Sequence, residues 1–331
     1  MSMLTKNNYV TIAIMISVIL FVPFFLYMPI EMADGVRAGN VFMLIIYSGF
    51  LAVTVAAIAV ICLFTIARRD YVKAQFNTLH HFRHLLKMMI KREFVIRYRR
   101  NVLGILWSVL NPILTMLVFT MVFSMIFRFH IPDVPFPVYL LSGQLIYIFF
   151  SESTNLAMGS ITGNAATIKK FYLPKYIFPV TKVISSLVNL GFSFVAFLVV
   201  VLVTGASFNA TLLLVFIPFI YIFVFSLGVG MILSSLSVFF RDLTYLYGIG
   251  ITLLMFLTPI FYPVEILPPR VFHLIHLNPL FHYVSYFRDV AVYGTIPGLW
   301  ANIVCIAFAL AAFCGGLYTM VSQQDKYILY L

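Results

Sequence analysis

The sequence has little charge, and negative charge is its scarcest feature. Only 9% of its 331 residues are Asp, Glu, Lys or Arg and just 10 are acidic, whereas 63% are hydrophobic. A soluble domain cannot bury that much apolar surface, because its exposed face needs far more charged residues. The composition therefore excludes a soluble globular protein and indicates an integral membrane protein.

The sequence also lacks the residue patterns of common catalytic and metal sites. Its 3 cysteines lie in apolar runs without metal-ligand spacing. His80, His81 and His84 have no cysteine or carboxylate cluster beside them, so we expect no metal site. G-x-x-x-x-G-K-[ST], H-E-x-x-H and G-x-S-x-G are all missing. We therefore expect a chain that is not an enzyme and that holds no ATP or other cofactor of its own.

Long apolar runs are what the sequence does contain, and runs of about 20 residues cross a membrane as helices. We predict an all-α protein with eight spans, at residues 9–30, 41–67, 102–127, 138–162, 177–204, 211–240, 243–262 and 298–321. Of the 21 lysines and arginines, only Arg37, Arg128, Arg270 and Arg288 then fall outside. By the positive-inside rule both termini are cytoplasmic.

The most basic part of the chain, residues 68–101, separates the second and third predicted spans. Its apolar side chains recur at helical spacing, with lysine and arginine between them: Phe82, Leu85, Leu86, Met89, Ile90 and Phe94. This pattern predicts an amphipathic helix in the plane of the cytoplasmic membrane surface. Its cations suit anionic phospholipids rather than nucleic acid, given the neighbouring spans. A plain lipid anchor and a site for an anionic ligand both remain open.

The fourth predicted span, 138–162, is unusually polar near its middle. Glu152 there must face protein or water rather than lipid, either in an interhelical hydrogen bond or along a polar translocation path. The chain also has 35 Phe and 19 Tyr, whose faces either fill cores or let a sugar polymer slide along them. The candidates for lining a conduit are Trp107, Phe119, Phe123, Glu152, Phe256, Phe261 and Tyr262.

Four separated stretches carry a recognisable pattern: RYRRNVLGILWSVLNP at 97–112, IKKFYLP at 168–174, VFFRDL at 238–243, and TPIFYP at 258–263 with LNPLFHYVSYFRD at 277–289. In this order they resemble the membrane subunit of ABC exporters for O-antigen, capsular polysaccharide and teichoic acid. The resemblance covers roughly residues 85 to 331 and implies a six-span ABC exporter transmembrane domain at 102–331. The predicted hairpin at 1–67 departs from that six-span pattern.

The resemblance implies a permease that works as a homodimer with two ATP-binding subunits, which bind the ATP and Mg. The cargo would be a lipid-linked polysaccharide that crosses the bacterial inner membrane. A short basic helix around 168–176 would couple to the ATPase and guard the cytoplasmic entrance. The implied coupling residues are Ile168, Lys169, Lys170, Phe171, Tyr172, Pro174, Lys175, Arg241 and Asp242.

The resemblance also implies a headgroup site and an outer gate. The pyrophosphate of the lipid-linked glycan would bind at Arg92, Arg97, Tyr98 and Arg99. Guanidinium groups suit phosphate oxygens because they donate two parallel hydrogen bonds. The external segment 263–297 would be a re-entrant gate, with these residues in it: Asn278, Pro279, Tyr283, Tyr286 and Arg288.

Two other functions fit parts of the sequence. One is an ABC permease for another amphiphile, such as a drug or a simple lipid. The other is a membrane glycosyltransferase or ligase that acts on lipid-linked sugars. The enzyme would need a catalytic carboxylate or arginine facing an external cavity, and its candidates are Glu265, Arg288 and Asp289.

Overall fold

An apolar chain in a membrane must satisfy its backbone hydrogen bonds internally, because lipid offers no hydrogen-bond partners. In agreement with this, the regular elements of the described residues are all helices. The computed structural model describes residues 82–98, 104–126, 131, 134–171, 173–206, 208–268, 275–323 and 326–331. The predicted hairpin at 1–67, residues 68–81 of the basic region, Arg99 and Tyr172 lie outside this description. All described residues belong to one unit, Phe82–Leu331.

Eight helices form most of the described chain. They are α4 (Arg83–Tyr98), α5 (Leu106–Thr120), α6 (Phe136–Met158), α8 (Ile177–Thr204), α9 (Phe216–Phe239), α10 (Leu243–Leu257), α12 (Pro279–Ala291) and α13 (Leu299–Gln323). The shorter elements are η2 (Met121–Ile126), η3 (Thr162–Asn164), α7 (Ala165–Lys170), η4 (Ala210–Val215), η5 (Val264–Ile266) and α14 (Tyr327–Tyr330). The element η2 continues α5 as a π-helical turn, and η4 leads into α9.

Four helical segments of the described residues are long and apolar enough to span a membrane: 106–124, 177–204, 210–239 and 299–323. The helix α6 is long enough at 23 residues, but polar side chains such as Gln144 and Glu152 interrupt its apolar surface. The helix α10 is apolar but has only 15 residues. The chain is therefore an all-helical membrane protein with four long apolar spans among the residues described.

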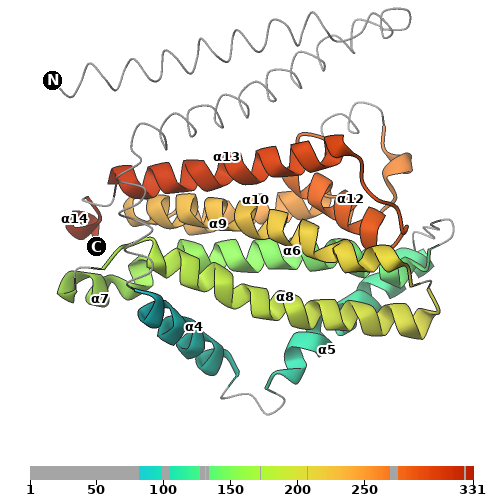
Figure 1. Ribbon diagram of the computed structural model, residues 1–331, viewed down its shortest axis with the longest axis horizontal. Coiled ribbons are helices and arrows are strands. Elements are labelled where there is room, and N and C mark those ends of the chain that lie inside the picture. The colour runs from blue at the N-terminus through green and yellow to red at the C-terminus, as the bar shows by residue number, and fades with distance from the viewer. Residues whose placement is uncertain are drawn as a thin grey trace, which may run out of the picture. The chain divides into compact units, whose positions relative to one another are not determined.

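The helices α6, α8, α9 and α13 run side by side along their length (Figure 1). The helix α12 lies at the end where α6 begins, and α7 and α14 lie at the opposite end (Figure 1). The contact between α9 and α13 requires glycine. A Cβ on Gly228 would lie 2.2 Å from the carbonyl carbon of Ala312, and one on Gly316 would lie 2.6 Å from the oxygen of Gly228. Close helix contact through small residues is typical of membrane proteins.

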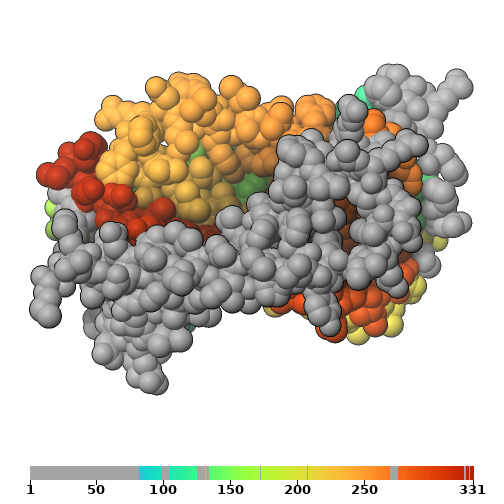
Figure 2. Space-filling model, turned by 90° about the horizontal axis from the view of Figure 1, so that it is seen from above, coloured from blue at the N-terminus to red at the C-terminus, as the bar shows by residue number. Residues whose placement is uncertain are grey.

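The helix α10 contributes an uncovered apolar surface. None of its residues is buried. Figure 2 shows the yellow-orange segment that includes it at the surface, at the top of the view. The most exposed apolar side chains of α10 are Tyr245, Leu246, Ile249, Leu253 and Phe256. A surface of this kind requires lipid or another protein chain beside it.

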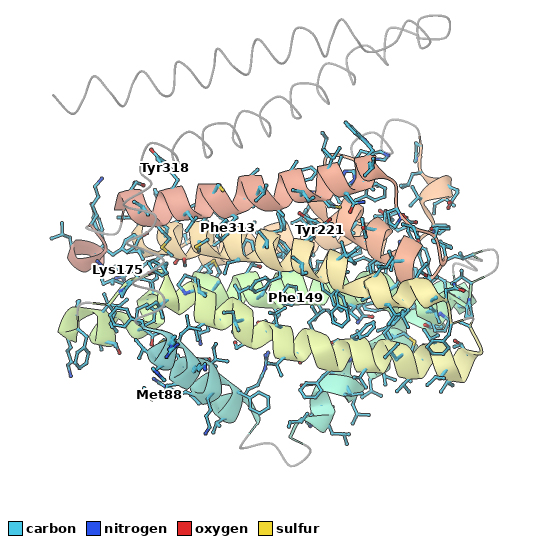
Figure 3. The ribbon with its side chains drawn as sticks, viewed as in Figure 1. Met88, Phe149, Lys175, Tyr221, Phe313 and Tyr318 are labelled. Atoms are coloured by element: carbon cyan, nitrogen blue, oxygen red, sulfur yellow. The ribbon has the colours of Figure 1, made fainter. Side chains whose placement is uncertain are left out.

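The helix α4 is the one predicted from the spacing of apolar residues at 82–94, and it is confirmed. All six apolar residues named above are half-buried, whereas Arg83, Lys87, Lys91 and Arg92 are exposed. The helix packs against α8, and Met88 projects from the face that points away from it (Figure 3). The sequence period therefore fixes which face of α4 contacts the protein.

Candidate functional site

A carboxylate on α6 joins three helices near the end of α4. The guanidinium of Arg97 on α4 donates to Oε1 of Glu152 in an ion pair. The other oxygen of Glu152 accepts a hydrogen bond of 2.6 Å from Nδ2 of Asn189 on α8. The Arg97 side chain is 36% exposed and that of Glu152 is 19% exposed, so the pair is partly solvated. The structure thus brings together Arg97, predicted for a headgroup, and Glu152, predicted for a conduit.

A cavity of about 320 Å³ opens beside this ion pair. Its walls come from α4, α5, α6 and α8. The polar and aromatic side chains that line it are Arg97, Trp107, Ser108, Asn111, Glu152, Asn189 and Ser193. The volume lies at the small end of the usual range for ligand sites. A guanidinium with amide and hydroxyl groups beside an indole face can bind an anionic group that is attached to a sugar or apolar body.

A second ion pair fastens α4 to α8. Nζ of Lys182 on α8 donates to Oε2 of Glu93 on α4 at 2.6 Å. Both side chains are partly exposed, at 21% and 27%. This pair holds α4 in place without using Arg97 or Glu152.

Sequence reasoning missed Glu93, Lys182 and Asn189, although one signal was present. Lys182 and Asn189 are seven residues apart on α8, which places them on one face of the helix. A lysine and an asparagine on one face of an otherwise apolar span indicate polar partners on a neighbouring helix.

The helix that carries Glu152 ends earlier than predicted. The helix α6 ends at Met158, six residues after Glu152. A rise of about 1.5 Å per residue puts Glu152 within about two turns of the helix end. The span was predicted to continue to residue 162, but Gly159 ends the helix and a 3₁₀ turn follows. Glu152 is therefore close to the end of α6 that leads into α7.

The other predicted headgroup residues lie differently from Arg97. Arg92 is exposed on α4 and does not line the cavity. Tyr98 is the last residue of α4. Arg99 lies outside the described residues. Of Arg92 and Arg97, the two headgroup candidates whose side chains the structure describes, Arg97 alone lines the cavity.

The short helix predicted around 168–176 is wrong in its bounds. The helix α7 spans Ala165–Lys170, and the chain is extended at Phe171. A helix cannot continue through Pro174, because proline lacks the N–H that would bond to the carbonyl of residue 170 and its ring clashes with that carbonyl. Ile168 is buried and anchors the segment, whereas Lys169, Lys170 and Phe171 are exposed.

The remaining coupling candidates divide by burial. Lys175 is buried at 7% exposure, so its side chain is not on the surface that a partner would contact. Pro174 is half-buried. Arg241 and Asp242 are exposed in the turn between α9 and α10. The described surface at this end of the chain therefore combines the tip of α7 with exposed charges after α9.

The predicted outer-gate residues on α12 are fastened to their surroundings. Asn278 accepts from the backbone N–H of Leu280 and donates to Oγ1 of Thr258 at 2.8 Å. Pro279 is the first residue of α12, a position that proline favours. The hydroxyls of Tyr283 and Tyr286 donate to α13, to the backbone oxygen of Cys305 and to Oδ1 of Asn302 respectively.

Arg288 is the most buried charged residue of α12, at 3% exposure. Its guanidinium donates to the backbone oxygens of Pro259 at 2.8 Å and Tyr139 at 3.2 Å. Nε donates to Oγ of Ser142 at 3.2 Å, and the guanidinium carbon lies 3.5 Å from the centroid of the Tyr139 ring. Arg288 therefore clamps α12 to the start of α6 and to the 258–263 segment. The enzyme alternative requires an arginine that faces an external cavity, whereas Arg288 is buried and its guanidinium donates to neutral protein groups.

Burial also changes the pKa of groups around Arg288. Desolvation lowers the pKa of the Arg288 guanidinium and raises that of the Asp289 carboxyl. Desolvation lowers the pKa of His282 to about 4, against the hydrogen bond with the backbone oxygen of His276, which raises it. His282 is therefore neutral at physiological pH. These shifts are those of a packed, poorly solvated region.

Four of the predicted conduit aromatics pack into one cluster. The rings of Phe119 and Phe123 lie 4.7 Å and 5.0 Å from that of Phe261, and Phe256 lies 6.4 Å from it. Phe261 is buried, whereas Phe256 is 57% exposed. The Tyr262 hydroxyl donates to the backbone oxygen of Phe256 at 2.7 Å. Phe261 thus fills the core, and Trp107 is the predicted aromatic that lines the cavity.

Comparison with known proteins agrees with this architecture. A family model described as ABC-2 type transporter matches residues 84–292. The O-antigen export system permease protein RfbA of Klebsiella pneumoniae is 31% identical over 238 residues, which cover 70% of this chain and 89% of that protein. RfbA of Myxococcus xanthus is 30% identical over 255 residues, covering 75% and 96%. The polysialic acid transport protein KpsM of Escherichia coli is 25% identical over 236 residues, covering 70% and 90%.

The matched region begins in α4 and ends just past α12, so the helices around the cavity all lie inside it. The three relatives are each covered over at least 89% of their length. Both observations confirm the resemblance that the sequence motifs indicated. The chain belongs to the ABC-2 type transporter family.

Proposed function

We propose that this chain is the permease subunit of an ABC exporter that moves a lipid-linked polysaccharide across the bacterial inner membrane. Hydrolysis of ATP takes place on a separate subunit. The family and the three relatives, two of them O-antigen export permeases and one a polysialic acid transport protein, support this function. The cargo is then a glycan of the O-antigen or capsule type.

The cavity beside Arg97 is the observation that carries the proposal. A lipid-linked glycan presents a diphosphate at the membrane surface, between a polyprenyl tail and a sugar chain. Arg97 supplies the guanidinium for that diphosphate, and Trp107 supplies an aromatic face beside it. Arg92, exposed on the same helix, adds positive charge that attracts the headgroup and anionic phospholipids to this surface.

The topology completes the proposal. Residues 1–67 form a hairpin, 68–101 form the cytoplasmic basic region, and 102–331 form the transmembrane domain with six further spans. Both termini are cytoplasmic, and the segment that contains α12 lies on the outer side as a gate. The clustering of lysine and arginine on one side supports this orientation.

Two exposed surfaces of the chain support the proposed assembly with a second copy and with ATPase subunits. The uncovered apolar face of α10 supports a homodimer in which this face meets the second copy. Lys169, Lys170 and Phe171 at the tip of α7 contact one of two ATPase subunits, together with Arg241 and Asp242. Ile168 is buried in the core, so a push on this tip is transmitted to α8 and α9.

The test is to purify the tagged full chain in mild detergent and to assay the eluate for ATPase activity. We expect a co-purifying ATPase whose activity rises when polyprenyl diphosphate-linked glycan is added. K169E/K170E should weaken this association because both charges are reversed on an exposed tip, whereas K326E, at an exposed position before α14, serves as the matched control.

Three results would contradict the proposal. If the chain purifies alone from several detergents, the proposed association with an ATPase subunit fails. A K169E/K170E variant with unchanged co-purification excludes the coupling role. ATPase activity that responds to a drug or a simple phospholipid but not to the diphosphate-linked glycan favours the alternative amphiphile.

A further inference from the structure

The cation of the proposed headgroup site already has an anionic partner in its own chain. Arg97 is paired with Glu152, and this pair forms part of the wall of the cavity. An incoming phosphate therefore competes with the Glu152 carboxylate for the guanidinium of Arg97. Headgroup binding is then an exchange of one anion for another, not the filling of an open cationic site.

We infer that Glu152 is a built-in competitor that excludes lipids with a single phosphate charge and admits a lipid diphosphate. The inference rests on the proposed function, because it assumes that Arg97 binds the headgroup. It assigns a specificity-determining role to Glu152, which the sequence suggested only as a conduit residue or an interhelical contact.

The discrimination follows from charge. A phosphodiester carries one negative charge, so replacing one carboxylate with it gains little electrostatic energy and leaves Glu152 without its cation. A diphosphate carries more than one negative charge and more acceptor oxygens, so its attraction to the guanidinium exceeds that of a carboxylate. This selectivity matters at a membrane surface, where anionic phospholipids far outnumber any glycan carrier and would occupy an uncovered arginine.

The geometry allows the exchange. Asn189 holds the second oxygen of Glu152 at 2.6 Å, so the carboxylate keeps one hydrogen bond when Arg97 leaves it. The Glu152 side chain is 19% exposed, so the carboxylate is partly solvated. The adjoining cavity of about 320 Å³ gives the headgroup room to approach the guanidinium. A fully buried carboxylate could not be uncovered in this way, because an unpaired buried charge is too costly.

The experiment measures binding of a radiolabelled polyprenyl diphosphate to the full chain in nanodiscs, made with phosphatidylcholine alone or with added phosphatidylglycerol. The wild-type Kd should be the same in both lipids. For E152Q we expect a Kd about fivefold lower in phosphatidylcholine, because a partly exposed competing ion pair is lost. Phosphatidylglycerol should then raise the E152Q Kd by about fivefold or more, since the guanidinium no longer has a competing carboxylate.

The matched control is E93Q, which breaks the Glu93–Lys182 pair between α4 and α8 and leaves Arg97 and Glu152 intact. We expect E93Q to keep the wild-type insensitivity to phosphatidylglycerol. If phosphatidylglycerol raised the Kd of E93Q as much as that of E152Q, any loosening of α4 would explain the change in Kd. That result would overturn the inference. An E152Q Kd that does not respond to phosphatidylglycerol would also overturn it.

Two further arms separate this inference from the proposed function. If R97Q binds the polyprenyl diphosphate as well as wild type does, the headgroup role of Arg97 fails, and the inference fails with it. If R97Q weakens binding but E152Q behaves as wild type, only the competitor role fails. Inorganic pyrophosphate is added as a soluble competitor, and binding as tight as that of the lipid would show a site for a free anion instead.

Discussion

Two arginines of this chain differ in what holds them. Arg97 lies at the edge of a cavity, 36% exposed, and pairs with the carboxylate of Glu152. Arg288 is 3% exposed and donates to backbone oxygens and a serine hydroxyl. The first arginine pairs with a partly solvated carboxylate for which an anionic ligand can compete. The second has several neutral partners on fixed backbone, which no ligand can replace without unfolding the region.

The comparison shows why burial and partner chemistry decide the role of an arginine. A guanidinium that is fully desolvated must satisfy its donors within the protein, and it then fixes the geometry of the elements around it. A partly solvated guanidinium keeps the option of another anion. Both residues were predicted to act on the substrate path; the structure buries Arg288 among neutral hydrogen-bond partners and places Arg97 beside the cavity, paired with Glu152.

The largest effect is expected for R288M. The substitution keeps most of the side-chain volume but leaves the oxygens of Pro259, Tyr139 and Ser142 without their donor. We expect a loss of about 3 kcal/mol in stability, because several buried acceptors lose their partner at once. Thermal unfolding of the detergent-solubilised protein measures it. An unchanged melting temperature with lost export would mean that Arg288 acts on the substrate rather than on the fold.

A smaller effect is expected for G143A on α6. An added Cβ would lie 2.8 Å from Nη2 of Arg288 and 3.3 Å from Cα of Ile260, so the clamp has to shift. We expect a loss of about 1–2 kcal/mol, as for other overpacked sites. The control is G248A on α10, where a Cβ has no atom within 4 Å. That variant should be neutral or slightly more stable, because alanine favours a helix over glycine. Equal melting temperatures for the two variants would refute the clamp.

Local patterns made some of this structure predictable. The apolar spacing at 82–94 predicted α4 and the face that packs against the protein. This was possible because helical periodicity can be seen within one short stretch of sequence. The ordered motifs predicted the family, which the matched region confirms. The bounds of α7 were missed because the predicted helix at 168–176 contains Pro174, through which a helix does not continue.

Long-range partners were not predictable from the same patterns. Arg97 and Glu152 are 55 residues apart, and nothing local in either segment says that they meet. Arg288 lies in an aromatic segment. The sequence of this segment does not indicate whether the arginine binds a ligand or donates to backbone oxygens. Those oxygens come from residues 139 and 259, on two other segments. Partner identity depends on how helices pack, and packing is a property of the whole chain.

The smallest effect on stability, and the sharpest contrast with R288M, is expected for R97Q. The glutamine amide can still donate to Glu152, and Glu152 keeps its hydrogen bond with Asn189. Loss of this partly exposed ion pair should therefore lower the free energy of unfolding by less than about 1 kcal/mol. Function should respond far more, because a charged donor to phosphate is lost. The concentration of polyprenyl diphosphate that gives half-maximal ATPase stimulation should rise about tenfold. K91Q, which removes an exposed cation from the same helix, should leave this concentration almost unchanged. If R97Q melts as early as R288M, Arg97 is a structural clamp too, and the contrast between the two arginines disappears.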